Sequence, residues 1–125
     1  IYAKVIQMKI LLTLFVLFFS SSVISSEVGG TAWMLIEEDG DKTVIFFELD
    51  GTLTYLNLVS NSGNQGVVYS DNNDTWYMNG DKLIISYNDG YMIVSLSFDD
   101  NKDKVYGSYM NKAGKTEKII GYIIN

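Results

Sequence analysis

Two adjacent tight turns, Asn79-Gly80 and Asp89-Gly90, constrain the fold of this chain more than any other feature. Each turn separates two short segments in which apolar or aromatic residues recur. Asn-Gly and Asp-Gly between such segments favour β-hairpins, because these residues tolerate the positive φ of tight hairpin turns. The sequence therefore predicts three consecutive antiparallel strands between residues 75 and 98.

The same turns predict which residues face each other across the strands. A two-residue loop at Asn79-Gly80 would place Trp76 opposite Leu83. The Asp89-Gly90 turn would pair Leu83 with Leu96, Ile85 with Val94 and Tyr87 with Met92. Cross-strand partners lie on one face of a sheet. The predicted apolar wall consists of Trp76, Leu83, Ile85, Tyr87, Met92, Val94, Leu96 and Phe98.

The rest of residues 31–124 repeats this pattern of short strands between turns rich in Gly, Asn and Asp. Three-residue loops at Asp39-Gly40-Asp41 and around Asp50-Gly51 would align Trp33 with Phe47 and Phe47 with Tyr55. The predicted strands cover residues 31–37, 43–49, 53–59, 67–69 with 75–78, 82–87, 91–98, 104–110 and 116–124. The fourth strand is interpreted as one strand interrupted by a bulge at residues 72–73.

These strands predict an all-β fold. About eight of them follow one another at near-even spacing, and no helical period is long enough to predict a helix. An antiparallel up-and-down meander closed into a small barrel leaves the fewest exposed edges, so we expect that architecture.

Composition excludes several classes of function. The chain has no Cys and no His, which removes disulfides, thiolate metal sites and the commonest general base. All nine basic residues are Lys, and the formal net charge is −6. Such an acidic chain would repel phosphate backbones, so we expect no nucleic-acid partner. No cofactor motif is present, and we expect none to bind.

The first 26 residues have the pattern of a secretory leader. Met8-Lys9 precedes an apolar run over residues 10–19, and a Ser-rich stretch follows it. We therefore predict upstream residues and a signal peptide over 1–26, and a folded domain over 27–125. The apolar run is too short to predict a membrane span, with an uncleaved anchor as the alternative, and we expect no stable span once the signal peptide is cleaved. The predicted location is extracytoplasmic, either periplasmic or secreted.

Four short motifs in this chain resemble those of the small bacterial lipocalin-like domains, which belong to the calycin group of up-and-down barrels. They are Gly30-Thr31-Ala32-Trp33, Phe47-Glu48-Leu49-Asp50-Gly51-Thr52, Trp76-Tyr77-Met78-Asn79-Gly80-Asp81-Lys82-Leu83 and Val105-Tyr106-Gly107. The resemblance covers nearly all of residues 29–124. It implies an extracytoplasmic barrel, in some members with a cavity for an apolar ligand, and no catalysis.

The predicted ligand-binding residues are those expected to line the barrel: Trp33, Phe47, Tyr55, Trp76, Met78, Leu83, Ile85 and Tyr87. They would hold a small apolar or amphipathic ligand, or they would simply fill the core, since a barrel of eight strands is just wide enough for either. Several strands are apolar on both faces, which leaves a second hypothesis open. In that hypothesis the barrel is solid and its outer face mediates assembly, for example into a homo-oligomer.

The acidic residues do not form a recognisable catalytic or metal motif. The acidic segments 71–74 and 99–103 are interpreted as solvated turns, because neither has the ligand spacing of a calcium loop. Glu37-Glu38 lies at a strand end beside a turn. We therefore expect no metal site and no enzymatic activity.

Overall fold

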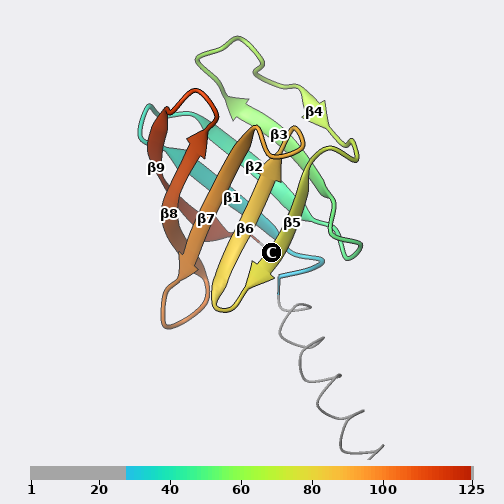
Figure 1. Ribbon diagram of the computed structural model, residues 1–125, viewed down its shortest axis with the longest axis vertical. Helices are drawn as coiled ribbons and strands as arrows, with labels where there is room; N and C mark the ends of the chain where they lie inside the picture. The colour runs from blue at the N-terminus through green and yellow to red at the C-terminus, as the bar shows by residue number, and fades with distance from the viewer. Residues whose placement is uncertain (1–27, 125) are drawn as a thin grey trace, which may run out of the picture.

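The computed structural model describes residues 28–124, which form one curled antiparallel sheet without helices in that range (Figure 1). The strands are β1 (Ala32–Glu37), β2 (Lys42–Phe47), β3 (Leu53–Val59), β4 (Val68–Tyr69), β5 (Thr75–Asn79), β6 (Lys82–Tyr87), β7 (Met92–Phe98), β8 (Lys104–Asn111) and β9 (Thr116–Ile123). The predicted all-β meander is confirmed, with nine strands instead of about eight.

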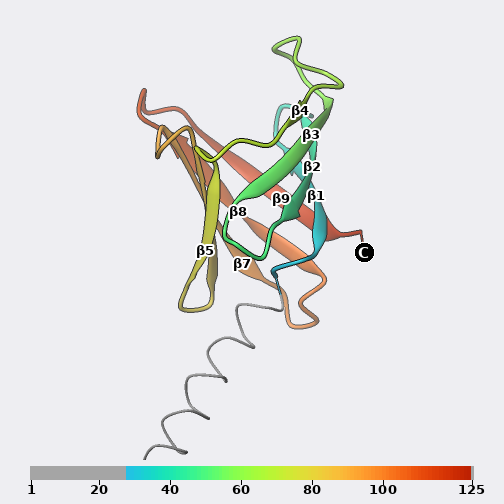
Figure 2. The ribbon, with the colours of Figure 1, turned by 90° about the vertical axis from the view of Figure 1, so that its right-hand side faces the viewer.

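The order of strands in the sheet is β4-β3-β2-β1-β9-β8-β7-β6-β5, so β9 returns to pair with β1. The sheet curls into a half-barrel, with β5 to β8 facing β1 to β3 (Figures 1 and 2). Its two edges meet at the bridge between Thr52 and Thr75. A second contact reinforces the bridge, because the Trp76 amide donates a 2.9 Å hydrogen bond to the Gly51 carbonyl. The predicted closure of the barrel is therefore limited to this contact between residues 51–52 and residues 75–76.

The prediction of one interrupted strand over residues 67–78 is wrong. β4 pairs with β3 and β5 pairs with β6, which places them at opposite edges of the sheet. The intervening segment crosses from one edge to the other and ends at Asp74. This carboxylate is buried, in contrast to the predicted solvated turn, and it accepts a 2.9 Å hydrogen bond from the Asn88 amide. Asp74 thereby ties the start of β5 to the turn after β6.

The predicted register across the Asp89-Gly90 turn is confirmed, since Leu83 pairs with Leu96 and Tyr87 with Met92. At Asn79-Gly80 the register differs by two residues, and Trp76 pairs with Ile85. The loop consists of Gly80 and Asp81, because Asn79 pairs with Lys82. Gly80 has φ 63°, so the glycine occupies the first loop position, as in a type II′ turn.

The two predicted three-residue loops are present, but each lies one residue earlier than predicted. Trp33 therefore pairs with Ile45, and Phe47 pairs with Leu53. Gly40 and Gly51 each occupy the last loop position, with φ of 94° and 91°. A three-residue hairpin loop needs a left-handed residue at that position, and glycine meets the requirement at least cost.

All three displaced registers shift by two residues, so every side chain keeps its predicted face. The interior is consequently the predicted apolar wall together with the inward residues of β1, β2, β3, β8 and β9. Fifteen buried residues form one core cluster, including Trp33, Phe47, Leu83, Ile85 and Leu96.

The predicted leader lies outside the described residues, as does the predicted boundary between residues 26 and 27. Among the residues that are described, no helix has the length and apolarity to cross a membrane.

Candidate functional site

A pocket of about 660 Å³ opens at the end of the curled sheet where β1 begins and β5 ends. This end carries the β5–β6 turn and the β7–β8 loop, at the bottom of Figure 1. Its apolar wall includes inward side chains from four strands: Trp33, Met78, Phe98 and Ile123. The volume lies within the range of about 300–1,000 Å³ that holds small organic ligands in proteins.

Trp33 is held rigidly at this mouth. Its indole Nε1 donates a 2.9 Å hydrogen bond to the Thr31 hydroxyl, which in turn donates to the Val28 carbonyl. The Phe98 ring packs on it edge-to-face, with the ring centroids 5.9 Å apart. A fixed, nearly buried indole gives the pocket a preformed apolar wall.

The rim of the pocket is acidic. Asp81, Asp99 and Asp100 line it, against one lysine, Lys102. The Asp99 carboxylate accepts hydrogen bonds from the amides of Asp103 and Lys104, so it also stabilises its own loop. The predicted role of this segment as a turn therefore agrees with its hydrogen bonds, and Asp81 and Asp100 remain exposed to solvent.

The eight predicted ligand-binding residues fall into three groups. Trp33 and Met78 line the large pocket. Tyr55 and Tyr87 line a smaller cavity at the other end of the sheet. The remaining four, Phe47, Trp76, Leu83 and Ile85, are buried in the core between these ends and line neither pocket. Their ligand-binding role stays a prediction.

The smaller cavity, of about 180 Å³, lies where β1 and β6 end, at the top of Figure 1. Tyr55 and Tyr87 meet edge-to-face in its wall, with centroids 5.3 Å apart. Glu37 contributes a carboxylate, and Thr43 and Asn57 contribute further polar groups. Burial raises the pKa of both tyrosine hydroxyls above the usual value, so the rings are neutral in the physiological range.

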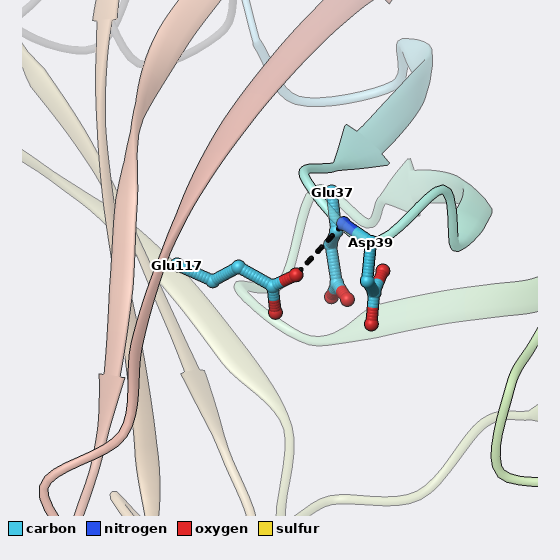
Figure 3. A group of neighbouring side chains, drawn as sticks. All are labelled: Glu37, Asp39 and Glu117. Carbon is cyan, nitrogen blue, oxygen red and sulfur yellow. Dashed lines mark hydrogen bonds between the residues drawn. The ribbon is translucent and has the colours of Figure 1, made fainter.

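Three carboxylates converge beside this cavity (Figure 3). Glu37, Asp39 and Glu117 each place one oxygen within 4.8 Å of the others. Glu117 accepts hydrogen bonds from the Asp39 amide at 2.9 Å and from the Tyr109 hydroxyl at 2.6 Å. Both carboxylate oxygens of Glu117 therefore already accept a hydrogen bond, one from the turn after β1 and one from β8.

The carboxyl group of Glu37 has a raised pKa. Burial, followed by repulsion from Asp39, Glu117 and Asp41, raises its pKa from 4.5 to about 7 against a small lowering effect of Lys115. At neutral pH this side chain is therefore close to half protonated. A carboxyl group with such a pKa binds or releases a proton in response to small changes in its surroundings.

Sequence reasoning missed Glu117 and Tyr109. The signal was the alternation in residues 116–123, where inward positions are Glu117, Ile119, Gly121 and Ile123. A carboxylate in an otherwise apolar inward series has to find partners. The partners themselves come from β8 and from the turn after β1, and no local pattern in the sequence connects them.

Replacement of Glu37 by Gln tests the raised pKa. In the wild type, a folded-state pKa above the unfolded value makes a stability contribution that is complete at low pH and is lost as pH rises from about 4.5 to about 7. Glu37→Gln removes this loss, so we expect the variant to be more stable than wild type by about 1 kcal/mol at pH 8, after screening at this half-exposed site.

Urea unfolding at pH 5 and pH 8 measures the effect. Glu38→Gln is the matched control, because Glu38 is exposed and neighbours Glu37. A Glu37→Gln variant whose advantage over wild type is the same at both pH values would contradict the raised pKa.

The outer face of β8 and β9 carries exposed large apolar side chains, namely Tyr106, Ile120 and Tyr122. Tyr106 pairs with Ile120 across the two strands, and the Lys104 ammonium lies 5.4 Å from the centre of the Tyr122 ring. Strands β8 and β9 thus carry apolar side chains on both the inner and the outer face of the sheet, as the sequence indicates.

The fold and the two end pockets define a small curled β-meander domain with an aromatic interior. No protein-family model matches the chain, and no curated protein sequence matches it. A crystal structure of a proposed β-lactamase from Burkholderia vietnamiensis is similar in fold, with a TM-score of 0.51, 14% identity, and coverage of 76% of this chain and 91% of that one. Rhizavidin in complex with biotin matches at a TM-score of 0.44 and 14% identity, over 78% of this chain and 97% of that one.

Proposed function

We propose that this protein is an extracytoplasmic, non-enzymatic binding module of the lipocalin-like type. Its ligand is a small apolar or amphipathic molecule, and the binding site is the 660 Å³ pocket at the mouth beside Trp33. The observation that carries the proposal is the combination of this volume with a rigid aromatic wall at an open end. Preformed concave sites with apolar walls and few polar groups are the usual sites for small molecules.

The charge around the mouth favours a neutral or cationic head group. Asp81, Asp99 and Asp100 outnumber Lys102 at the rim, and the chain contains no Arg that could clamp a carboxylate or phosphate. An anionic head group would lie among carboxylates without a strong counter-charge, which is unfavourable.

Three ligands with the same alkyl tail test this proposal: dodecanol, dodecylamine and dodecanoate. A Trp76→Phe background leaves Trp33 as the reporter tryptophan, since the chain has two. We expect dodecanol and dodecylamine to change its fluorescence with saturation, and dodecanoate to bind at least about tenfold more weakly at neutral pH. Tight binding of dodecanoate alone would contradict the electrostatic argument.

A pair of matched variants locates the site. Asp81→Asn with Asp100→Asn should weaken dodecylamine binding and leave dodecanol binding unchanged, because only the charged head group depends on the rim. Asp89→Asn is the control, as Asp89 is an exposed carboxylate on a turn outside the pocket. If Asp89→Asn weakened dodecylamine binding as much as the double variant, the ammonium group would not lie at this rim.

The second candidate function is assembly through the outer face. The exposed Tyr106, Ile120 and Tyr122 favour it, because contiguous apolar side chains on a sheet surface are common in interfaces. Analytical ultracentrifugation of the domain tests it. A concentration-dependent dimer that Tyr122→Ser dissociates, together with no response to any of the three ligands, would favour assembly over ligand binding.

A further inference from the structure

The small cavity between Glu37, Tyr55 and Tyr87 combines one carboxylate with aromatic and apolar walls, as a binding site for a small ligand would. It lies at the opposite end of the sheet from the proposed ligand pocket, and the two have no lining residue in common. Its volume of about 180 Å³ is below that of pockets for drug-sized ligands, so an occupant has only a few non-hydrogen atoms. We propose that this cavity binds a small organic cation, of the methylated or primary ammonium class, with Glu37 as the counter-charge.

The charge of the cavity selects a cation. Glu37 is the one charged side chain that lines it, and no lysine does. The carboxylates of Asp39 and Glu117 lie within 4.8 Å of the Glu37 carboxylate, and this repulsion makes the ionised form unfavourable while the cavity holds no counter-charge. A cation beside Glu37 would offset that repulsion, whereas an anion would add to it.

The walls select an organic cation. Two neutral rings, Tyr55 and Tyr87, pack edge-to-face in the wall with an interplanar angle of 81°, and Tyr69 stacks on Tyr55 with the centroids 5.0 Å apart. The faces of such rings attract ammonium groups, most strongly where the cation is desolvated. Further apolar surface, which suits methyl groups, comes from Leu35, Met92, Val94 and Ile119, and Asn88 adds one more polar residue to the lining.

The polar atoms of the cavity are poorly suited to a metal ion. Calcium takes six to eight oxygen ligands. In this cavity the Thr43 hydroxyl donates to the Asn57 side-chain carbonyl at 3.3 Å, so both groups already have a partner. Glu37 alone supplies a charged oxygen to the cavity, which is enough for a single positive charge on an ammonium group.

Binding should depend on pH through Glu37. Tetramethylammonium keeps its charge at every pH, so its affinity should rise between pH 6 and pH 8 as the Glu37 carboxyl loses its proton. The titratable and charged groups that interact with Glu37 come from four parts of the fold: Asp39 and Asp41 after β1, Tyr87 on β6, Tyr109 on β8, and Lys115 with Glu117 at the start of β9. Tyr87 and Tyr109 stay protonated in this range, because burial raises their pKa.

The test is titration of the full chain with tetramethylammonium chloride, followed by amide NMR shifts, with sodium chloride at equal ionic strength as the reference. We expect saturable shifts at the ends of β1 and β6, and an affinity at least about tenfold lower in Glu37→Gln. Glu38→Gln should bind within about twofold of wild type, since it changes an exposed neighbour outside the cavity.

Three results would overturn the proposal: no saturable shift, shifts confined to the large pocket, or equal affinity in Glu37→Gln and Glu38→Gln. A parallel titration with calcium chloride separates the two cation classes. Calcium shifts at Glu37 without a tetramethylammonium response would assign the site to a metal ion and would reject the organic cation. The result is read separately from that of the proposed ligand pocket, because the two pockets share no lining residue and shifts at each end are resolved individually.

Discussion

Trp76→Ala is expected to destabilise the domain by about 3–5 kcal/mol, the usual range for truncation of a buried aromatic residue. Trp76 is 8% exposed, and its ring packs edge-to-face on Phe47 with centroids 5.7 Å apart. The indole Nε1 also donates a 2.8 Å hydrogen bond to the Glu48 carbonyl. Loss of the ring therefore creates a cavity and leaves a carbonyl without its donor.

The position of Trp76 means that its loss should destabilise the whole sheet. The residue follows Thr75, which forms the bridge that joins the two edges of the curled sheet. Equilibrium unfolding in urea measures the loss, and a domain of this size has only about 5–15 kcal/mol to lose. Trp76→Phe is the matched control, because it keeps an aromatic ring and removes the hydrogen bond, and it should cost less than Trp76→Ala. A loss below about 1 kcal/mol for Trp76→Ala would mean that the side chain is exposed.

Gly107→Ala should have an effect of at least similar size and prevent normal folding. A Cβ atom at Gly107 would lie 1.9 Å from the Ser95 carbonyl oxygen and 3.0 Å from the Leu96 Cα. Both are backbone atoms of the paired strand β7, so no rotamer change relieves the clash. Separating β7 from β8 would break the ladder, and we expect a loss of about 4 kcal/mol or more, at the extreme of single substitutions.

Two variants calibrate the Gly107 result. Ser108→Ala changes the next residue of β8, which is exposed, and should alter stability by less than about 0.5 kcal/mol. Gly121→Ala should lie between the two, because its closest contacts are the side chains of Leu35 and Val105, which can move. Chemical denaturation with far-ultraviolet circular dichroism ranks all three. Equal stability of Gly107→Ala and Ser108→Ala would contradict the close approach of the strands.

The sequence showed the position of Glu37 but not its proximity to Glu117. The sequence places Glu37 at a strand end, and the structure agrees. Glu117 lies 80 residues further along the chain, and it reaches Glu37 only because β9 returns to pair with β1. No spacing rule joins residues so far apart, so the raised pKa and the small cavity could not be predicted.

The division of the aromatic residues between two ends has the same origin. All eight residues that were predicted to line a ligand site point inward. Position along each strand, which the sequence does not reveal, decides that Trp33 reaches the mouth while Ile85 stays in the packed centre. Local alternation specifies a face, and only the arrangement of all strands specifies depth within the interior.

The sequence alone determined the strands, the turns and the inward faces, because alternation and turn residues act over a few neighbours. It determined the faces even where the register differed by two residues, since strand side chains repeat with a period of two. Tertiary structure decided the rest. It separated β4 from β5 through the Asp74 anchor, joined the edges at Thr52 and Thr75, and placed the pockets at the two ends. These features depend on contacts between distant segments, whose loop-closure cost and packing cannot be deduced from local sequence.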